Sequence, residues 1–247
     1  MSADAMSSRE AEPEHWFEPI ADHLGMAYLR YSFTKGTDQE VGFLVDALGL
    51  EPGQRVLDVG CGPGRHAHEM ARRGLLVHGV DISRRFVELA TQGAPSGATF
   101  ERLDARRLCF HDEFDVAISL CQGAFGLVTG PGEDAVVLAG MANALKPGGR
   151  LALSAFNAYF QMRHGAGELD AATGINHEWT EVRDEAGEAK AVELWTHCFT
   201  PTELHALVVA AGLRLDAIWS VEPGDYARRR PSVDSAEYLV VATKSGR

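Results

Sequence analysis

Hydrophobic and polar positions along this chain follow two patterns, short apolar runs and amphipathic stretches with helical spacing. Seven apolar runs predict buried strands, at residues 56–59, 75–80, 100–103, 114–120, 150–156, 213–221 and 237–242. Amphipathic stretches such as residues 65–73 and 133–145 predict helices between them. Because strands alternate with helices, we expect right-handed crossovers and a mostly parallel sheet covered on both faces.

Capping signals predict where three of the helices begin. Thr37 with Glu40 and Thr200 with Glu203 have the form of capping boxes, in which both side chains satisfy backbone groups at a helix N-terminus. Ser83 is expected to cap the helix that follows the second strand.

The pattern changes between the fifth and sixth strands. Residues 157–190 are polar and glycine-bearing, and 178–183 with 192–199 could pair as a hairpin. An insert of this length exceeds ordinary connections and is expected to have a role of its own. We therefore predict one domain over residues 37–247 with an insert at about 157–199. Residues 1–36 precede it as a tail and an aromatic-rich segment.

Composition and charge exclude several classes of protein. The 247 residues include 35 acidic and 23 basic side chains, a net charge of −12, so a nucleic-acid partner is not expected. No signal peptide can be recognised near the start, and the longest apolar stretches are too short to span a bilayer. Four cysteines without paired spacing predict reduced thiols in a cytoplasmic protein.

A glycine-rich turn follows the first strand, in Asp58-Val59-Gly60-Cys61-Gly62-Pro63-Gly64. Glycines here allow positive φ and close approach of a ligand to the backbone. Asp81 ends the second strand, where a carboxylate can accept both hydrogen bonds of a ribose diol. A nucleotide-type ligand is therefore expected at this edge of the sheet.

The spacing distinguishes two ligand classes. A dinucleotide fingerprint needs its third glycine at position 65, where Arg65 stands instead. Asp58 would repel a pyrophosphate, whereas a ligand with an ammonium group would favour that carboxylate.

From about residue 37 to residue 242, these features resemble the class I S-adenosylmethionine-dependent methyltransferases. The resemblance implies that the glycine turn wraps the methionine part of S-adenosylmethionine, with contacts at Gly60, Cys61, Gly62 and Gly64. It also implies that Asp58 supports the turn and the cofactor's amino group.

The same resemblance implies further cofactor contacts. Asp81 would hold the ribose hydroxyls and Ile82 the adenine face, while Asp104 would accept from the adenine amino group, with Ala105 nearby. Leu120 ends the fourth strand, where the family places cofactor and substrate contacts, and Gln122 follows it as a substrate candidate. Two tyrosines before the first core helix could form a cover over the cofactor or simply pack: Tyr28 and Tyr31.

The fold implied is a three-layer α/β Rossmann-like fold, with a mostly parallel seven-stranded sheet, an antiparallel last strand and a lid insert after strand five. The activity implied is methylation of a small molecule at oxygen or nitrogen by in-line displacement, in a monomer or homodimer. Two alternatives stay open: a fold relative that uses the cofactor for another reaction, and a non-catalytic cofactor-binding protein.

Candidates for the chemistry itself are few. His164 and His177 in the insert could act as general bases, or could simply be exposed histidines. Arg228 and Arg229 belong to a charge run that could attract an anionic substrate, or could be a solvated loop. No metal site is expected, and no Gly-x-Ser-x-Gly elbow or phosphate-binding lysine motif is present.

Overall fold

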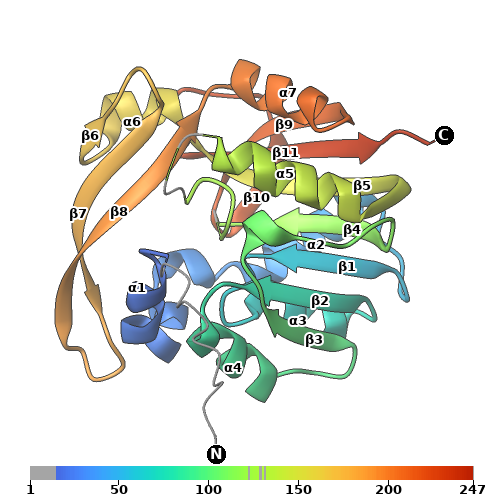
Figure 1. Cartoon of the computed structure of the whole chain (residues 1–247), viewed down its shortest axis with the longest axis horizontal. Coiled ribbons are helices and arrows are strands. Elements are labelled where there is room, and N and C mark those ends of the chain that lie inside the picture. The colour runs from blue at the N-terminus through green and yellow to red at the C-terminus, as the bar shows by residue number, and fades with distance from the viewer. Residues whose placement is uncertain (1–14, 122, 128–129, 131, 247) are drawn as a thin grey trace, which may run out of the picture.

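A mixed β-sheet forms the centre of the molecule (Figure 1). The computed structural model describes residues 15–121, 123–127, 130 and 132–246. The sheet runs in the order β10-β9-β11-β5-β4-β1-β2-β3. The strands are β1 (Arg55–Val59), β2 (Leu76–Asp81), β3 (Ala98–Arg102), β4 (Phe114–Ser119), β5 (Leu145–Asn157), β9 (Leu213–Glu222), β10 (Asp225–Arg229) and β11 (Glu237–Lys244).

The pairing confirms the predicted mostly parallel sheet with an antiparallel last strand. Strands β3, β2, β1, β4 and β5 pair in parallel, whereas β11 is antiparallel to both β5 and β9. The path contains eight strands rather than seven, because β10 forms within a segment predicted to be a loop.

Helices cover both faces of the sheet and complete the three layers. On one face α2 (Thr37–Leu48) and α3 (Arg65–Arg72) bury their apolar sides, and on the other α5 (Glu133–Ala144) and α7 (Pro201–Ala210) do so. Successive side chains of β1 point to opposite faces of the sheet: Val56 packs on the side of α2, and the next residue, Leu57, packs on the side of α5. Because consecutive residues of the strand are apolar, each face of the sheet can bind a layer of helices.

The insert forms the predicted hairpin, from β7 (Ile175–Arg183) and β8 (Ala189–Phe199). It also contains a helix and a strand that were not predicted, α6 (Ala158–His164) and β6 (Glu168–Leu169). The last residues of β8 pair with the end of β5, which anchors the hairpin to the sheet.

The N-terminal segment packs against this hairpin. It forms α1 (Glu18–Leu24) and two 3-10 turns, η1 (Gly25–Arg30) and η2 (Ser32–Thr34). Figure 1 shows α1 between the hairpin and α4 (Arg84–Gln92). A small apolar cluster joins the three elements and is formed by Ile20, Ala21, Leu24, Phe86, Leu89, Val182 and Val192. The partners of the aromatic-rich segment are thus the insert and α4.

Two of the three predicted helix caps are confirmed. The Ser83 hydroxyl accepts from the Phe86 N–H at 3.1 Å, and Thr200 with Glu203 forms a capping box. The box predicted at Thr37 and Glu40 is wrong, because Gly36 is the N-cap and no side chain caps α2.

Glu40 instead joins three other parts of the chain. Its carboxylate accepts from Arg65 Nη1 at 2.6 Å, from His66 Nε2 at 2.7 Å and from the Gly224 N–H at 2.8 Å. Burial raises the pKa of Glu40, but the bonds from His66 and the charge of Arg65 outweigh it and hold the pKa at about 2. Burial lowers the pKa of His66 to about 4, so the network is a Glu40–Arg65 ion pair with a neutral histidine.

We expect Glu40→Gln to lower the free energy of unfolding by about 3 kcal/mol, because it leaves the buried Arg65 charge without its counterion. Urea unfolding at pH 7, followed by circular dichroism, measures this loss. Asp38→Asn in the same helix is the matched control, since its ion pair with Arg73 is exposed and its loss should be undetectable. Equal losses in the two variants would contradict the interpretation.

Candidate functional site

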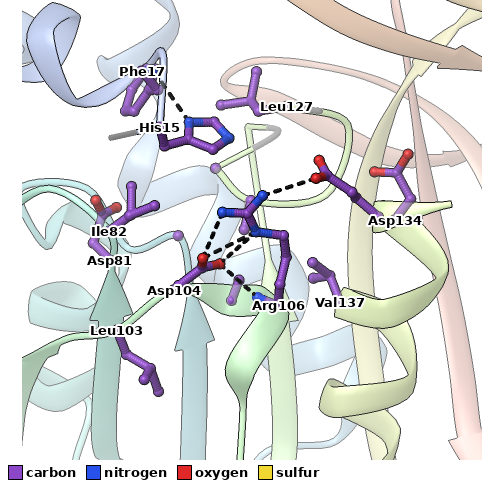
Figure 2. A pocket seen from close by; sticks show the side chains of 15 residues that line it. His15, Phe17, Asp81, Ile82, Leu103, Asp104, Arg106, Leu127, Asp134 and Val137 are labelled. Atoms are coloured by element: carbon purple, nitrogen blue, oxygen red, sulfur yellow. Dashed lines mark hydrogen bonds and ion pairs between the residues drawn. The ribbon is translucent and has the colours of Figure 1, made fainter. Parts of the chain in front are cut away.

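A pocket opens at the carboxyl edge of β1, β2 and β3, where ligands bind in sheets of this type. The empty space in it, counted together with the solvent at its mouth, is about 490 Å³. Figure 2 shows Asp81, Ile82, Leu103 and Asp104 at the strand ends, with Asp134 and Val137 on the opposite wall. The N-terminal segment contributes His15 and Phe17.

The glycine turn adopts the backbone predicted for it. Gly60, Gly62 and Gly64 have φ values of 72°, 55° and 83°, all in the left-handed region. A Cβ added at Gly60 would lie 2.2 Å from the carbonyl carbon of Gly123. Only glycine therefore allows the segment after β4 to cross the turn this closely.

Asp81 ties this turn to the end of β2. One carboxylate oxygen accepts from the Gly62 N–H and the other from the Ser83 N–H, each at 2.8 Å. Each oxygen keeps a second lone pair, so the side chain can still accept from a ligand in the pocket. Burial raises the pKa of Asp81 to about 6.

Arg106 crosses the pocket floor and was not predicted from the sequence. It donates to Asp104 Oδ2 at 2.7 Å and to Glu133 Oε1 at 2.9 Å, which joins the end of β3 to the start of α5. Burial raises the pKa of Asp104, but the bonds from Arg106 outweigh this and lower it. The sequence feature that could have indicated this ion pair is the position of Arg106, two residues after the predicted acid Asp104.

Asp58 lies at the end of β1 and does not line the pocket. Its side chain is buried, and Oδ2 has no hydrogen-bond partner within the described part of the chain. Burial raises the pKa of Asp58 to about 7, with a smaller rise from Asp81, against the lowering effect of Arg65. Such an acceptor suits a positively charged group.

The structure brings five predicted cofactor residues to the pocket: Gly60, Asp81, Ile82, Asp104 and Ala105. The other predicted cofactor residues are not among those that line the pocket. Cys61 is buried against Gly79, and Leu120 belongs to the apolar core. Gln122 lies outside the described residues.

The two predicted tyrosines have different environments. The Tyr28 ring packs on Phe86 at 5.1 Å, and a Cβ at Gly62 would lie 3.9 Å from it, so it faces the glycine turn. Tyr31 faces the hairpin instead, where its hydroxyl accepts from the Arg183 N–H at 3.3 Å.

Neither histidine suggested as a base lines the pocket. His177 stacks on Trp195 at 3.8 Å and donates to Glu193 at 2.9 Å, on the hairpin. His164 is half-exposed on α6, 3.9 Å from an Asp234 oxygen. The alternative, that these are histidines on the surface of the insert, agrees with the structure, and we do not propose them as bases.

The arginine run is likewise remote from the pocket. Arg228 donates to Asp46 at 2.9 Å and Arg229 donates to Asp225 at 2.7 Å, both on or beside β10. Because each charge already has a carboxylate partner, the prediction of substrate-attracting arginines is not supported.

A histidine–aspartate pair connects the hairpin to the pocket wall. His197 Nδ1 lies 2.7 Å from Asp134 Oδ2, and Asp134 Oδ1 accepts from the Gly126 N–H at 2.6 Å. No sequence motif indicates this pair, because its members come from β8 and α5. It fixes the base of the hairpin relative to the segment after β4.

The described residues contain no group of three or more histidine, cysteine, aspartate or glutamate side chains that could hold a metal ion. Within these same ranges, no helix is both long and apolar enough to cross a membrane.

The buried Asp58 carboxylate should make stability depend on pH. Its folded pKa lies above the unfolded value, so the cost of ionising it is present at high pH and disappears as the pH falls. We expect Asp58→Asn to be more stable than wild type at pH 8, with the difference shrinking by roughly 2 kcal/mol by pH 5. Urea unfolding at both pH values tests this.

Asp46→Asn is the control for this measurement, since Asp46 is an exposed acid on α2. Its difference from wild type should stay the same at both pH values. A constant difference for Asp58→Asn as well would show that this carboxylate is not the titrating group.

Comparisons with known proteins agree with this arrangement. The family described as methyltransferase domain matches residues 56–149. The ubiquinone biosynthesis O-methyltransferase of Xanthomonas axonopodis pv. citri is 32% identical over 210 residues, which cover 79% of this chain and 78% of that protein.

Two further similarities are to proteins from Streptomyces. Methyltransferase GfsG of Streptomyces halstedii is 34% identical over 117 residues, 45% of this chain, and the matched part spans only 41% of that protein. The structure of the CcbJ methyltransferase from Streptomyces caelestis superimposes with a TM-score of 0.73 at 20% identity, covering 94% of this chain and 97% of that one. This second likeness shows the fold.

Proposed function

Because the chain belongs to the class I S-adenosylmethionine-dependent methyltransferases, we propose that it methylates an oxygen or nitrogen of a small molecule by in-line displacement. The observation that supports this most directly is one pocket lined by Gly60, Asp81, Ile82, Asp104 and Ala105. When bound, S-adenosylmethionine supplies an electrophilic methyl group on a sulfonium.

The donor set of the pocket suits that cofactor. Asp81 has lone pairs for ribose hydroxyls, and Ile82 with Leu103 offers apolar surface to the adenine. Asp104 can accept from the adenine amino group. The buried Asp58 oxygen, which lacks a partner in the described residues, favours an ammonium group nearby.

We propose that the N-terminal segment and the β7–β8 hairpin together cover the site. They pack on each other through α1, and Phe17 and Tyr28 reach the pocket and the glycine turn. A cover of this kind excludes water and aligns the two reactants, and alignment alone supplies several kcal/mol in a displacement. No general base is required for this proposal.

The acceptor is proposed to be a small molecule rather than nucleic acid, given the net charge of −12. The name of the Xanthomonas relative, an O-methyltransferase, favours oxygen as the acceptor atom. A cytoplasmic location and a monomeric or homodimeric state remain part of the same proposal.

The proposal is tested by incubating the protein with methyl-labelled S-adenosylmethionine and fractionated metabolite extracts. We expect S-adenosylhomocysteine and a labelled product in at least one fraction. Asp81→Asn should reduce product formation at least tenfold, because ribose binding loses a charged acceptor. Cofactor binding without S-adenosylhomocysteine in any fraction would favour a non-methylating relative or a non-catalytic binder.

The cover is tested by hydrogen exchange with and without S-adenosylhomocysteine. We expect slower exchange over α1, η1 and the hairpin when the ligand is present, because a closed cover opens less often. Strand β10, at the far edge of the sheet, serves as the internal control and should not change. Unchanged exchange in α1 and the hairpin would exclude a role as cover.

A further inference from the structure

Glu237, the first residue of β11, is a buried acid outside the pocket described above. It pairs with Phe156 near the end of β5 and with Val221 of β9, so it lies at the carboxyl edge of the parallel strands. Leu239 and Val241 of the same strand pack on the side of α2, and alternation places the Glu237 side chain on that side too. The residue is only 7% exposed, and glutamate is seldom buried this fully. Its surroundings therefore decide what this carboxylate can bind.

Tyr226 reaches the same edge of the sheet from β10. The Gly224 N–H donates to Glu40 at 2.8 Å. The Gln39 side chain donates to the Tyr226 carbonyl at 2.8 Å and accepts from its N–H at 2.9 Å, so the start of β10 is held against α2. Tyr226 is 2% exposed, and its hydroxyl has no hydrogen-bond partner among the described residues. This hydroxyl can therefore still donate to a ligand or accept from one.

The charges that act on this hydroxyl come from other elements of the fold. Burial raises the pKa of Tyr226 well above its ordinary value. Cys121, Glu237 and Glu40 raise it further, whereas Arg65 lowers it. Glu40 and Arg65 form an ion pair, and Cys121 is a neutral thiol at pH 7 because burial raises its pKa to about 12. Of these four side chains, Glu237 is the one whose charge is not matched by another member of the set.

Tyr28 connects these groups to the glycine turn. Its ring faces the turn, since a Cβ at Gly62 would lie 3.9 Å from it. Burial raises the pKa of Tyr28, and the charges of Asp81 and Glu237 contribute to the same rise. Tyr28 is therefore close both to the acid that holds the turn and to Glu237.

An in-line displacement limits where the acceptor can lie. The attacking atom approaches the methyl group from the side opposite to the sulfur, so it does not share the pocket over β2 and β3. Beyond the glycine turn after β1, the next strands along the sheet are β4, β5 and β11. Ligands of such sheets lie beyond the carboxyl ends of the parallel strands, and Glu237 lies at that edge. Glu237 and Tyr226 are thus on the acceptor side of the turn.

The groups on this side select an acceptor by its charge. An anion would be repelled by Glu237, and Arg65, whose charge also acts here, is bound to Glu40. An ammonium group can donate to the Glu237 carboxylate and to the Tyr226 oxygen, and the ring of Tyr28 offers an aromatic face to a cation. The net charge of −12 also attracts cations to the protein.

We propose that the acceptor molecule carries a protonated amine, which binds the Glu237 carboxylate and the Tyr226 hydroxyl. This inference rests on the proposed function and names a substrate class for the same site, a small organic cation. It concerns the charge of the acceptor molecule and not the atom that receives the methyl group.

The test uses three probes of similar size: benzylamine, benzyl alcohol and benzoate are cationic, neutral and anionic at pH 7.5. Each is titrated into protein saturated with S-adenosylhomocysteine, and binding is measured by ligand-observed NMR. We expect benzylammonium to bind about tenfold more tightly than either of the other two, because hydrogen bonds to a charged group are stronger. In Glu237→Gln this preference should fall to about threefold or less.

Two further variants identify the cause. Asp225→Asn also removes one carboxylate, but an exposed one beside Tyr226, and should keep the wild-type preference. Tyr226→Phe keeps the ring and removes the hydroxyl, and should weaken benzylammonium binding about threefold. Should Glu237→Gln fail to fold, Tyr226→Phe serves for the same comparison. An equal loss in Asp225→Asn would show attraction to the acidic surface alone and overturn the proposal.

Cofactor affinity separates this inference from the proposed function. Glu237→Gln should bind S-adenosylmethionine and S-adenosylhomocysteine within about threefold of wild type. Weaker binding of S-adenosylmethionine alone would assign Glu237 to the sulfonium and overturn the proposal. Wild type without a preference for benzylammonium, or a preference that persists in Glu237→Gln, also overturns it, while cofactor binding stays intact. If wild type binds neither form of the cofactor, the proposed function itself fails.

The charge of the natural acceptor gives a second readout. Metabolite extracts are separated on a cation-exchange resin at pH 7.5, and both fractions are incubated with the protein and methyl-labelled S-adenosylmethionine. We expect the labelled product to form from the retained, cationic fraction. A product that forms only from the unretained fraction would overturn the proposal and leave the methyltransferase activity established.

Discussion

The carboxylate of Asp81 holds the site together by accepting backbone N–H groups from two separate segments. One bond comes from Gly62 in the glycine turn and the other from Ser83 at the start of α4. Because the carboxylate is buried, both bonds are strong and neither donor is left unsatisfied. The turn, the end of β2 and the start of α4 therefore keep one relative position, and the lone pairs that remain face the pocket.

Around Asp81, one buried carboxylate has a charged partner and another does not. Glu40 and Arg65 form a complete ion pair that ties α2 to α3, and this pair supports the fold. Asp58 has an unpartnered oxygen within the described ranges, and its ionisation costs stability. Such a carboxylate fits a binding site in which the ligand supplies the counterion. The free protein is then less stable than it would be with a neutral side chain at this position.

The parts that cover the site are held by packing and a few polar contacts. The hairpin is anchored at β5, tied to α5 through His197 and Asp134, and packed on α1 through small apolar groups. The N-terminal segment and the insert are distant in the chain but adjacent in space (Figure 1).

The sequence by itself determined seven strands of the sheet, both helical layers and the strand-end residues that line the pocket. These features depend on short-range patterns: apolar runs for strands, glycines for positive φ, and an acid at a strand end, as at Asp81. Local capping at Ser83 and Thr200 was readable for the same reason.

Only the tertiary structure decided which polar side chains meet across elements. Glu40 had the local form of a cap, yet Arg65 and His66 from α3 offered charged and buried partners, and these outweigh one backbone bond. His177 and Arg228 had suitable chemistry, but strand pairing placed them on the hairpin and on β10, away from the pocket. Long-range pairing depends on how separate elements pack, and no local pattern encodes it.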